Sequence, residues 1–213
     1  MEMYAYYEDY VMSAQRILGD MLDYAVNTCE IEADDFFQMF LTSGLAEQFE
    51  NGNPAYVAGI TGCELFKKVI RKSGLTVPDI PDEMYMDKSP EYWAGWALAY
   101  YQWYTGKMFR RIHKAVSIEE VLFMYPTLHE ADIMKFVTIM EEKYRKFYLE
   151  TNLKRIRKNA GLSQNELACL SGLPVRQIQL FEQRQRDINK TQALNLWKLG
   201  KVLGCRSEDL LEI

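Results

Sequence analysis

The sequence lacks the features of membrane-spanning and secreted proteins. No stretch approaches the roughly 18 uninterrupted apolar residues of a membrane span, and WAGWALAYYQWY (93–104) holds only 12 residues. The N-terminus, MEMYAYYEDY, has no basic region followed by an apolar run, so we expect no secretory signal. These absences predict a protein that does not associate with a membrane.

Cysteine and histidine are scarce, and neither forms a pattern that would hold a metal. The four cysteines are widely spaced, with no CxxC pair and no histidine nearby: Cys29, Cys63, Cys169 and Cys205. This spacing is typical of buried, reduced thiols and fits a cytoplasmic protein. His113 and His129 have no partner at ligand spacing, so we expect surface or capping roles for both. The sequence therefore predicts no metal site.

Motifs of catalysis and cofactor binding are also missing. The chain has no phosphate loop, nucleophile elbow or Rossmann fingerprint. Three pairs of neighbouring acids occur, at Asp34-Asp35, Glu119-Glu120 and Glu141-Glu142. Neighbours on a helix point about 100° apart, which favours a solvated surface over a metal or acid–base site. We therefore predict a protein that is not an enzyme and needs no cofactor.

The chain does have a strong asymmetry of charge and aromatic content. Residues 1–150 hold 14 Lys/Arg and 24 Asp/Glu, a net charge of −10, whereas residues 151–213 hold 11 Lys/Arg and 6 Asp/Glu, a net charge of +5. Of the 28 aromatic residues, 26 lie before residue 151, and only Phe181 and Trp197 follow it. We therefore predict two domains, 1–150 and 151–213. A basic segment of this kind suits the neutralisation of DNA phosphates.

Helical patterns run through the whole of the first domain. Apolar side chains recur at three-and-four spacing over 3–27, which predicts one helix with a buried stripe. The stripe consists of Tyr7, Val11, Ala14, Leu18, Met21, Leu22 and Ala25. A second helix is expected over 33–42, where Gly44 stops it, followed by a short helix that ends at 51–53.

Proline after a capping residue predicts the start of two further helices. Asn53-Pro54 begins a helix that is expected to close at Gly74, and Ser89-Pro90 begins an aromatic helix that ends at Gly106. The segment 75–88 between them contains two prolines and four acids. We expect it to be an ordered loop.

The end of the first domain leaves one question of helix length open. Ser117 and Glu120 form a capping box, which predicts a short helix that ends before Tyr125-Pro126. Residues 129–159 contain neither glycine nor proline. They are expected to form either one long helix that joins the two domains or two helices hinged near 150–152.

The second domain shows an ordered series of helix signals. A basic helix is followed by a capped helix, a tight glycine turn, a second capped helix and two short helices. Ser163 and Glu166 form a capping box for the first of these capped helices. Gly172 can take the positive φ that the turn needs. Pro174 then occupies the first turn of the next helix, where proline is tolerated.

The helix over 174–184 is expected to be amphipathic in a way that suits the major groove of DNA. Ile178 and Phe181 point to one side of it. The opposite side carries Arg176, Gln179, Leu180 and Gln183. Arginine can pair with guanine, glutamine can pair with adenine, and a leucine methyl group can contact thymine.

The segment LKRIRKNAGLSQNELACLSGLPVRQIQLFEQRQRDINKTQALNLWKLGKVLGCRSEDLLE, from Leu153 to Glu212, resembles the helix-turn-helix domain of the Cro and phage-repressor (XRE) family. The resemblance implies a five-helix, lambda-repressor-like DNA-binding domain behind a helical N-terminal domain. It implies that Gln164 grips a backbone phosphate and that the third helix is the recognition helix. The residues that would contact bases are Val175, Arg176, Gln177 and Gln179.

The loop and helix start after the recognition helix are expected to bind the DNA backbone. Arg184, Arg186 and Lys190 lie there and would position the domain without carrying sequence information. The sequence departs from the family pattern at two points. Pro174 stands where a small polar residue usually begins the recognition helix, which removes one phosphate contact, and 182–184 lacks the usual glycine.

The first domain carries an unusual aromatic block over 92–104. Core packing is the default explanation, and a protein-binding or dimerising surface that contains Trp93, Trp96 and Trp103 is the main rival. This half is also similar to helical domains of regulators from gut Firmicutes, a resemblance that implies no defined activity.

Together these patterns predict an all-α, two-domain, cytoplasmic bacterial transcription regulator. We expect the second domain to bind a specific double-stranded DNA site as a homodimer on paired half-sites, and the first to bind a protein or mediate dimerisation. Two alternatives stay open. One is an antitoxin-like protein that neutralises the product of a neighbouring gene and represses its own gene. The other is a sensor with an aromatic-lined pocket for a small molecule.

Overall fold

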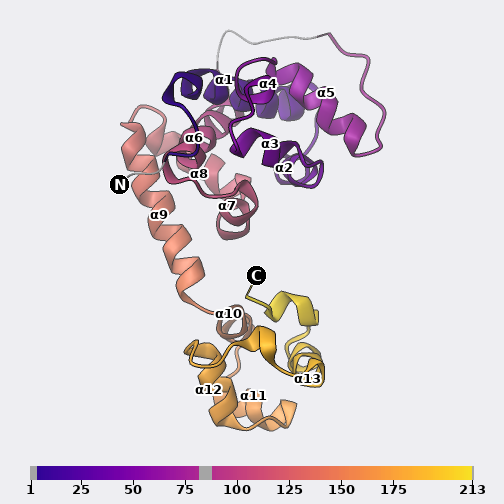
Figure 1. The fold of residues 1–213 in the computed structure, drawn as a ribbon, viewed down its shortest axis with the longest axis vertical. Coiled ribbons are helices and arrows are strands. Elements are labelled where there is room, and N and C mark those ends of the chain that lie inside the picture. Colours follow the sequence, from indigo (N-terminus) through magenta and orange to yellow (C-terminus); the bar gives the residue numbers. More distant parts are fainter. Residues whose placement is uncertain (1–3, 82–87, 213) are drawn as a thin grey trace. The chain divides into compact units, whose positions relative to one another are not determined.

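The structure, a computed structural model, describes residues 4–81 and 88–212. All of the secondary structure in these two ranges is helical, so the predicted all-α class is confirmed. The chain divides into two compact units, Met1–Tyr144 and Arg145–Ile213 (Figure 1). The charge pattern predicts a boundary after residue 150, whereas this division falls inside the helix Ile133–Leu149. The last turn of that helix packs with the second unit, where the Arg155 guanidinium lies 4.5 Å from the Phe147 ring.

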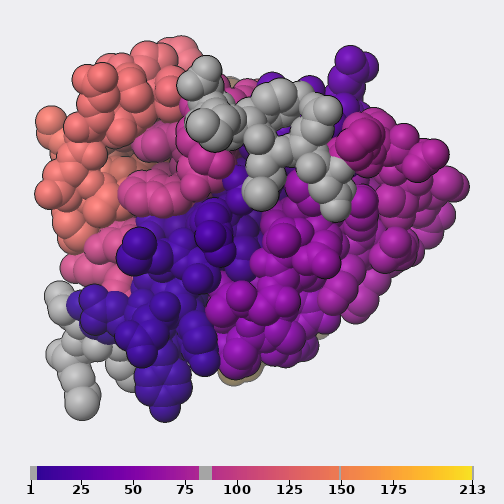
Figure 2. Space-filling view, turned by 90° about the horizontal axis from the view of Figure 1, so that it is seen from above, coloured from indigo at the N-terminus to yellow at the C-terminus, as the bar shows by residue number. Residues whose placement is uncertain are grey.

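In its described residues the first unit contains the helices α1 to α8 and most of α9. Their bounds are α1 Val11–Asp23, α2 Ala33–Thr42, α3 Leu45–Glu50, α4 Pro54–Val57, α5 Gly62–Lys72, α6 Pro90–Thr105, α7 Phe109–Ala115, α8 Ile118–Leu128 and α9 Ile133–Leu149. A 3₁₀ turn (η1, Glu8–Tyr10) precedes α1, and a π-helical turn (η2, Tyr24–Thr28) follows it. Seen from above, the indigo residues of the N-terminal segment and α1 lie beside the purple and magenta residues of α4 and α5 (Figure 2).

Helices α1 and α6 pack with their backbones in direct contact, because both carry glycine at the crossing. A Cβ atom on Gly95 would lie 2.4 Å from the carbonyl oxygen of Leu18, and one on Gly19 would lie 2.9 Å from that of Tyr92. Neither position has room for a side chain. The close approach buries one side of the aromatic helix α6 against α1.

Two helices of the first unit start or break where the sequence pattern does not predict. The expected helix over 3–27 begins only at Val11 in α-helical form, and Tyr7, expected in its buried stripe, is 81% exposed. The expected helix from Asn53-Pro54 to Gly74 is two helices, α4 and α5. A capping box formed by Thr61 and Glu64 begins α5. The chain breaks there because Gly62 lies against the backbone of α1, where a Cβ atom would clash at 2.5 Å.

Helices α6 and α8 begin at the residues that the sequence pattern predicts, but only α6 also ends where predicted. Ser89 caps α6 and Gly106, in the left-handed conformation, ends it. The predicted capping box of Ser117 and Glu120 begins α8, but α8 continues through Pro126 to Leu128. The predicted loop over 75–88 is non-helical in its described part, 75–81, and 82–87 lie outside the described residues.

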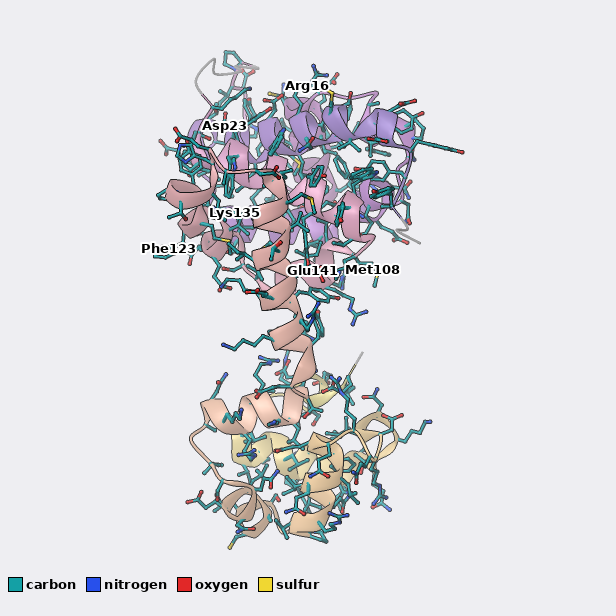
Figure 3. The ribbon with its side chains drawn as sticks, turned by 90° about the vertical axis from the view of Figure 1, so that its left-hand side faces the viewer. Arg16, Asp23, Met108, Phe123, Lys135 and Glu141 are labelled. Atoms are coloured by element: carbon teal, nitrogen blue, oxygen red, sulfur yellow. The ribbon has the colours of Figure 1, made fainter. Side chains whose placement is uncertain are left out.

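Aromatic side chains form much of the core of the first unit. Seven phenylalanines are fully or almost fully buried: Phe36, Phe37, Phe40, Phe49, Phe66, Phe109 and Phe136. Several meet edge to face, as Phe37 and Phe109 do at 5.9 Å between ring centroids. Phe123 is the opposite case, since it projects from α8 into solvent and is 89% exposed (Figure 3).

The second unit consists of shorter helices around its own small core. Their bounds are α10 Asn152–Asn159, α11 Gln164–Ser171, α12 Val175–Glu182, η3 Ile188–Lys190, α13 Ala193–Leu203 and η4 Ser207–Leu210. The core residues are Leu153, Leu167, Leu173, Ile178, Phe181, Ile188, Leu199 and Leu210. Of the two alternatives for 129–159, the structure shows separate helices: α9 ends at Leu149, and the Thr151 side chain caps α10.

Neither a membrane-spanning helix nor a metal-binding cluster is found in the described part of the chain. No helix there is long and apolar enough to cross a membrane. No group of three or more His, Cys, Asp and Glu side chains among the described residues is placed to hold a metal ion. The four cysteines are free, but only Cys63 is buried as expected: Cys29 and Cys205 are half-buried, and Cys169 is exposed on α11.

Candidate nucleic-acid interface

Helix α11 begins at a capping box and is joined to α12 by a tight turn at Gly172. The Ser163 amide donates to the Glu166 carboxylate at 2.7 Å, and the Glu166 amide donates to the Ser163 hydroxyl at 3.2 Å, which completes the predicted capping box. These hydrogen bonds lower the pKa of Glu166. Gly172 ends α11 with φ +66°. Pro174 directly precedes α12, and no side chain caps that helix, so the expected second cap is absent.

Helix α12 has one buried side and one open side, as the pattern predicts. Ile178 and Phe181 are buried in the core, while Arg176 and Gln183 are exposed. The other three residues predicted to contact bases are half-buried: Val175, Gln177 and Gln179. Because residues four apart on a helix are neighbours, Gln177 lies on the flank beside Phe181 rather than at the centre of the open side.

A buried ion pair removes the only carboxylate of α12 from the surface. Nε and Nη2 of Arg157, on α10, donate to the two oxygens of Glu182 at 2.6 and 2.8 Å. The Glu182 side chain is 2% exposed. Nη1 of Arg157 also donates to the carbonyl oxygen of Leu162 at 2.6 Å. Hydrogen bonding to Glu182 raises the pKa of Arg157. The open side of α12 therefore presents no negative charge.

Gln164, predicted to grip a phosphate, lies at the start of α11 and contacts the same carboxylate. Its Nε2 donates to Oε2 of Glu182 at 2.8 Å. A side-chain amide carries two N–H groups. One therefore orients Gln164 on Glu182, which leaves the other as a donor at the N-terminus of α11.

Arg184 is held by the second unit itself. It has φ +55°, a left-handed conformation that side chains other than glycine adopt at a cost. Its Nη2 donates to the carbonyl oxygen of Tyr148 at 2.7 Å and to the Glu212 carboxylate at 3.2 Å. The glycine that the family places here is absent, but the backbone takes the conformation that glycine would favour.

The two other predicted phosphate contacts are more open. Arg186 is exposed, with its guanidinium 5.9 Å from the ring of Phe181. The Lys190 side chain is 84% exposed and lies 3.6 Å from the Asp187 carboxylate, also on the surface. An exposed pair of this kind contributes little to stability. Both cations are therefore accessible to a polyanion.

The second unit as a whole is basic. Over 145–213 it holds 13 Lys/Arg (the 11 after residue 150 plus Arg145 and Lys146) and 7 Asp/Glu (the 6 after residue 150 plus Glu150), a net charge of +6. Unlike the first unit, it has a surface on which cations outnumber acids almost two to one.

The tryptophans predicted as a protein-binding surface lie mainly inside the first unit. Trp93 is 8% exposed and packs edge to face on Phe136 at 5.4 Å. Trp103 is 4% exposed, and its Nε1–H donates to the carbonyl oxygen of Tyr6 at 2.9 Å. Trp96 is half-buried. Core packing therefore describes Trp93 and Trp103, which have almost no surface to offer a partner.

The sequence pattern does not reveal what the acids of the first unit do. Asp34, placed in a solvated pair by its spacing, accepts hydrogen bonds from the amides of Ile118 and Glu119 at 2.8 and 3.1 Å and contacts Nε2 of His113 at 2.7 Å. It thus caps α8 from another helix. Glu50 does the same for α7, accepting from the Phe109 amide at 2.7 Å. Such partners are far apart in the chain, so no local motif marks them.

Comparisons of the chain with protein-family models, curated proteins and solved structures find no match.

Proposed function

We propose that the chain is a sequence-specific DNA-binding transcription regulator whose second unit is a five-helix, XRE-type helix-turn-helix domain. The observation that carries this proposal is the open side of α12. It presents Arg176, with Gln183 exposed directly after the helix, while the one carboxylate of the helix, Glu182, is buried against Arg157. A helix with this face suits the major groove, since arginine pairs with guanine and glutamine with adenine.

In this proposal Arg176 makes the central base contact. It is the one predicted base-contacting residue that is exposed, and it lies in the first turn of α12. Gln179, half-buried on the same side, provides the second contact. Val175 and Gln177 lie at the flanks, where they would contact base edges or the sugar–phosphate chain as the helix enters the groove.

Four side chains would hold the DNA backbone. Arg186 and Lys190 are accessible cations, and Gln164 keeps one amide hydrogen for a phosphate. Arg184 contributes less, because its Nη2 is already bonded to Tyr148 and Glu212. The charge of +6 on the second unit supports the same assignment, since phosphate neutralisation supplies much of the affinity for DNA.

We further propose that the regulator acts as a homodimer on two half-sites. A single short recognition helix covers only a few base pairs, and helix-turn-helix proteins generally extend the site by two-fold symmetry. Light scattering of the full chain, alone and with selected DNA, measures this directly. A monomer that binds a single non-palindromic site would overturn the dimer while leaving the DNA-binding assignment intact.

The test of DNA binding is selection of sites from random duplex DNA with the full chain, followed by affinity measurements over a series of salt concentrations. We expect a defined consensus and a log–log salt dependence with a slope of about −0.9 for each phosphate contacted. Lys190→Ala should weaken all sequences alike and reduce the slope by about one. Arg71→Ala, which removes one exposed cation from the first unit, is the matched control and should change neither. No consensus, or binding that does not depend on salt, would reject the proposal.

A further inference from the structure

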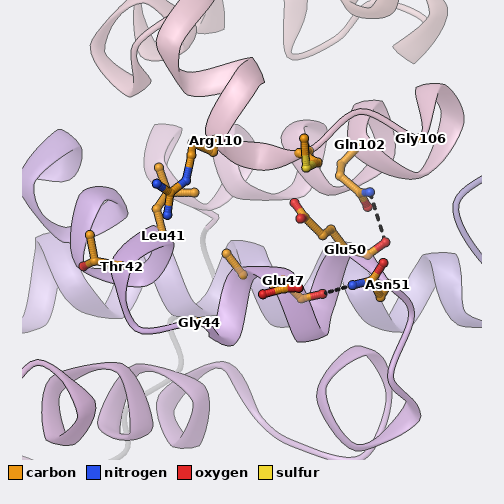
Figure 4. Close-up of a pocket in the computed structure, with 11 residues that line it drawn as sticks. Leu41, Thr42, Gly44, Glu47, Glu50, Asn51, Gln102, Gly106 and Arg110 are labelled. Atoms are coloured by element: carbon orange, nitrogen blue, oxygen red, sulfur yellow. Dashed lines mark hydrogen bonds between the residues drawn. The ribbon is translucent and has the colours of Figure 1, made fainter. Parts of the chain in front are cut away.

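The first unit contains an open, polar pocket between α3 and the segment that joins α6 to α7 (Figure 4). Its volume is about 520 Å³, within the range of about 300–1,000 Å³ that is usual for small-molecule sites. The side chains that define its chemistry are Glu47, Glu50, Gln102, Met108 and Arg110. No aromatic residue lines it, unlike the pocket expected for a sensor.

Gln102 supplies an unpaired hydrogen-bond acceptor at this pocket. The residue is 1% exposed, and its Nε2 donates to the carbonyl oxygen of Glu50 at 3.2 Å. Its Oε1 is buried without a hydrogen-bond partner in the described residues. Buried polar atoms are rarely left unpaired, since the loss of water is not compensated. The pocket wall therefore calls for a donor at Oε1 of Gln102.

Two carboxylates line the same pocket. Glu47 and Glu50 are three residues apart on α3 and so share one side of the helix. One oxygen of Glu50 accepts from the Phe109 amide at 2.7 Å, which leaves the other oxygen for a ligand. Burial, and secondarily the charge of Glu47, raise the pKa of Glu50. A cation placed between the two acids would compensate both effects.

Arg110, on α7, gives the pocket a positive charge. It is exposed and forms no ion pair within 4 Å in 4–81 and 88–212, although its charge acts on Glu50 and partly offsets the rise in the pKa of that carboxyl. Figure 4 shows Glu50 and Gln102 on one side of the pocket and Arg110 on the other. A ligand would therefore meet acceptors and negative charge on one side and a guanidinium, which binds carboxylates through paired N–H groups, on the other.

We propose that this pocket binds a small zwitterion of the amino-acid type. Its ammonium group, with three N–H donors, contacts the carboxylates of Glu47 and Glu50, and a shift of the Gln102 side chain would open Oε1 to it as a third acceptor. Its carboxylate contacts Arg110. Met108, unbranched and half exposed, covers part of the site and can shift to admit the ligand. The capping of α7 by Glu50 explains one of its oxygens, but neither the unpaired Oε1 of Gln102 nor the position of the Arg110 guanidinium beside the pocket.

The experiment compares ω-amino acids that differ in the distance between their ammonium and carboxylate groups. β-Alanine, 4-aminobutyrate and 6-aminohexanoate separate the two charges by increasing distances, and butylamine and butyrate carry one charge each. Binding to the full chain is measured by saturation-transfer NMR and calorimetry at millimolar concentrations, where ligands of a few atoms usually bind. We expect saturable binding that favours one chain length, with binding of butylamine and butyrate at least tenfold weaker.

Two charge-removing variants locate the site. Glu50→Gln keeps an oxygen that can accept from Phe109, and Arg110→Gln removes the guanidinium; each should weaken binding of the preferred zwitterion at least tenfold. Glu130→Gln, a matched change at an 89% exposed side chain of the same unit, should leave it unchanged. Unchanged circular dichroism shows that the variants are folded. Absence of saturable binding, equal binding of butylamine, or equal losses in all three variants would overturn the proposal.

Discussion

Removing the guanidinium of Arg157 should destabilise the second unit more than any change on its surface. In the variant Arg157→Met, Glu182 stays buried without its partner, and the Leu162 carbonyl loses a donor. Breaking a buried ion pair from one side costs about 3–5 kcal/mol. Because Glu182 keeps the hydrogen bond from Gln164, we expect the lower end, about 3 kcal/mol.

That loss is large for a unit of this size. Residues 145–213 number 69, and at about 0.05–0.15 kcal/mol per residue the free energy of unfolding would be about 3–10 kcal/mol. The variant should therefore be marginally folded in its second unit only. Arg157→Met combined with Glu182→Leu removes both charges and should recover most of the loss, since apolar replacements of buried pairs are often neutral or better.

Hydrogen exchange of the full chain, followed by mass spectrometry, measures this effect unit by unit. Amides of α10 to α12 should exchange at least a hundredfold faster in Arg157→Met, the factor that corresponds to about 3 kcal/mol. Amides of α1 and α6 should be unchanged and serve as the internal control. If the protection of α10 to α12 stays within tenfold of the parent, the loss of Arg157 costs less than the about 3 kcal/mol expected from breaking its ion pair with Glu182.

Three further outcomes are expected. Arg184→Gly should be about 1 kcal/mol more stable to denaturant than Arg184→Ala, because both lose the same contacts but only glycine accepts φ +55° without strain; equal stabilities would contradict this. Gly95→Ala should lower the free energy of unfolding of the first unit by about 1–3 kcal/mol, because its Cβ would press on the Leu18 carbonyl, and a change below about 0.5 kcal/mol in calorimetry would contradict it. Burial raises the pKa of Glu50, so the folded state binds this proton more tightly than the unfolded state, and the charged carboxylate costs stability at neutral pH. That cost is relieved as pH falls through the raised pKa, so the stability of Glu50→Gln relative to the parent should be greater at pH 7 than in acid. A difference in melting temperature between the two proteins that does not change with pH would contradict this.

Local chemistry in the sequence predicts much of the fold. The capping boxes at Ser117 and Ser163 and the turn at Gly172 form as expected, because each depends on residues within a few positions of one another. The amphipathic pattern of α12 likewise predicts which side is buried, since Ile178 and Phe181 alternate at helical spacing.

Features that depend on distant contacts are not predictable in this way. The helix break before α5 requires Gly62 to meet the backbone of α1. The capping role of Asp34 requires α8 to begin against α2. The burial of Trp93 and Trp103 depends on how tightly α6 packs on α1, which aromatic content alone cannot specify.

The candidate site likewise combines features that local sequence predicts with features that distant contacts decide. Arg176 is open, as the helical pattern predicts. The engagement of Gln164 with Glu182 and of Arg184 with Tyr148 is decided by tertiary contacts with side chains or carbonyls at least 18 positions away. The pocket beside Gln102 has no sequence signal at all, because its walls come from four separate helices, α2, α3, α6 and α7, and the segments between them.

The most direct test of the central claim is the loss of base discrimination when the Arg176 side chain is removed. Affinities of the full chain and of Arg176→Ala are measured for the selected DNA site and for a set of single base-pair variants of it. The account predicts that the parent loses about 1–3 kcal/mol at one guanine-containing position per half-site, and that Arg176→Ala binds the original and substituted sites equally at that position. If Arg176→Ala retains the full discrimination of the parent at every position, α12 does not contact the bases through this residue, and the proposed recognition face is wrong.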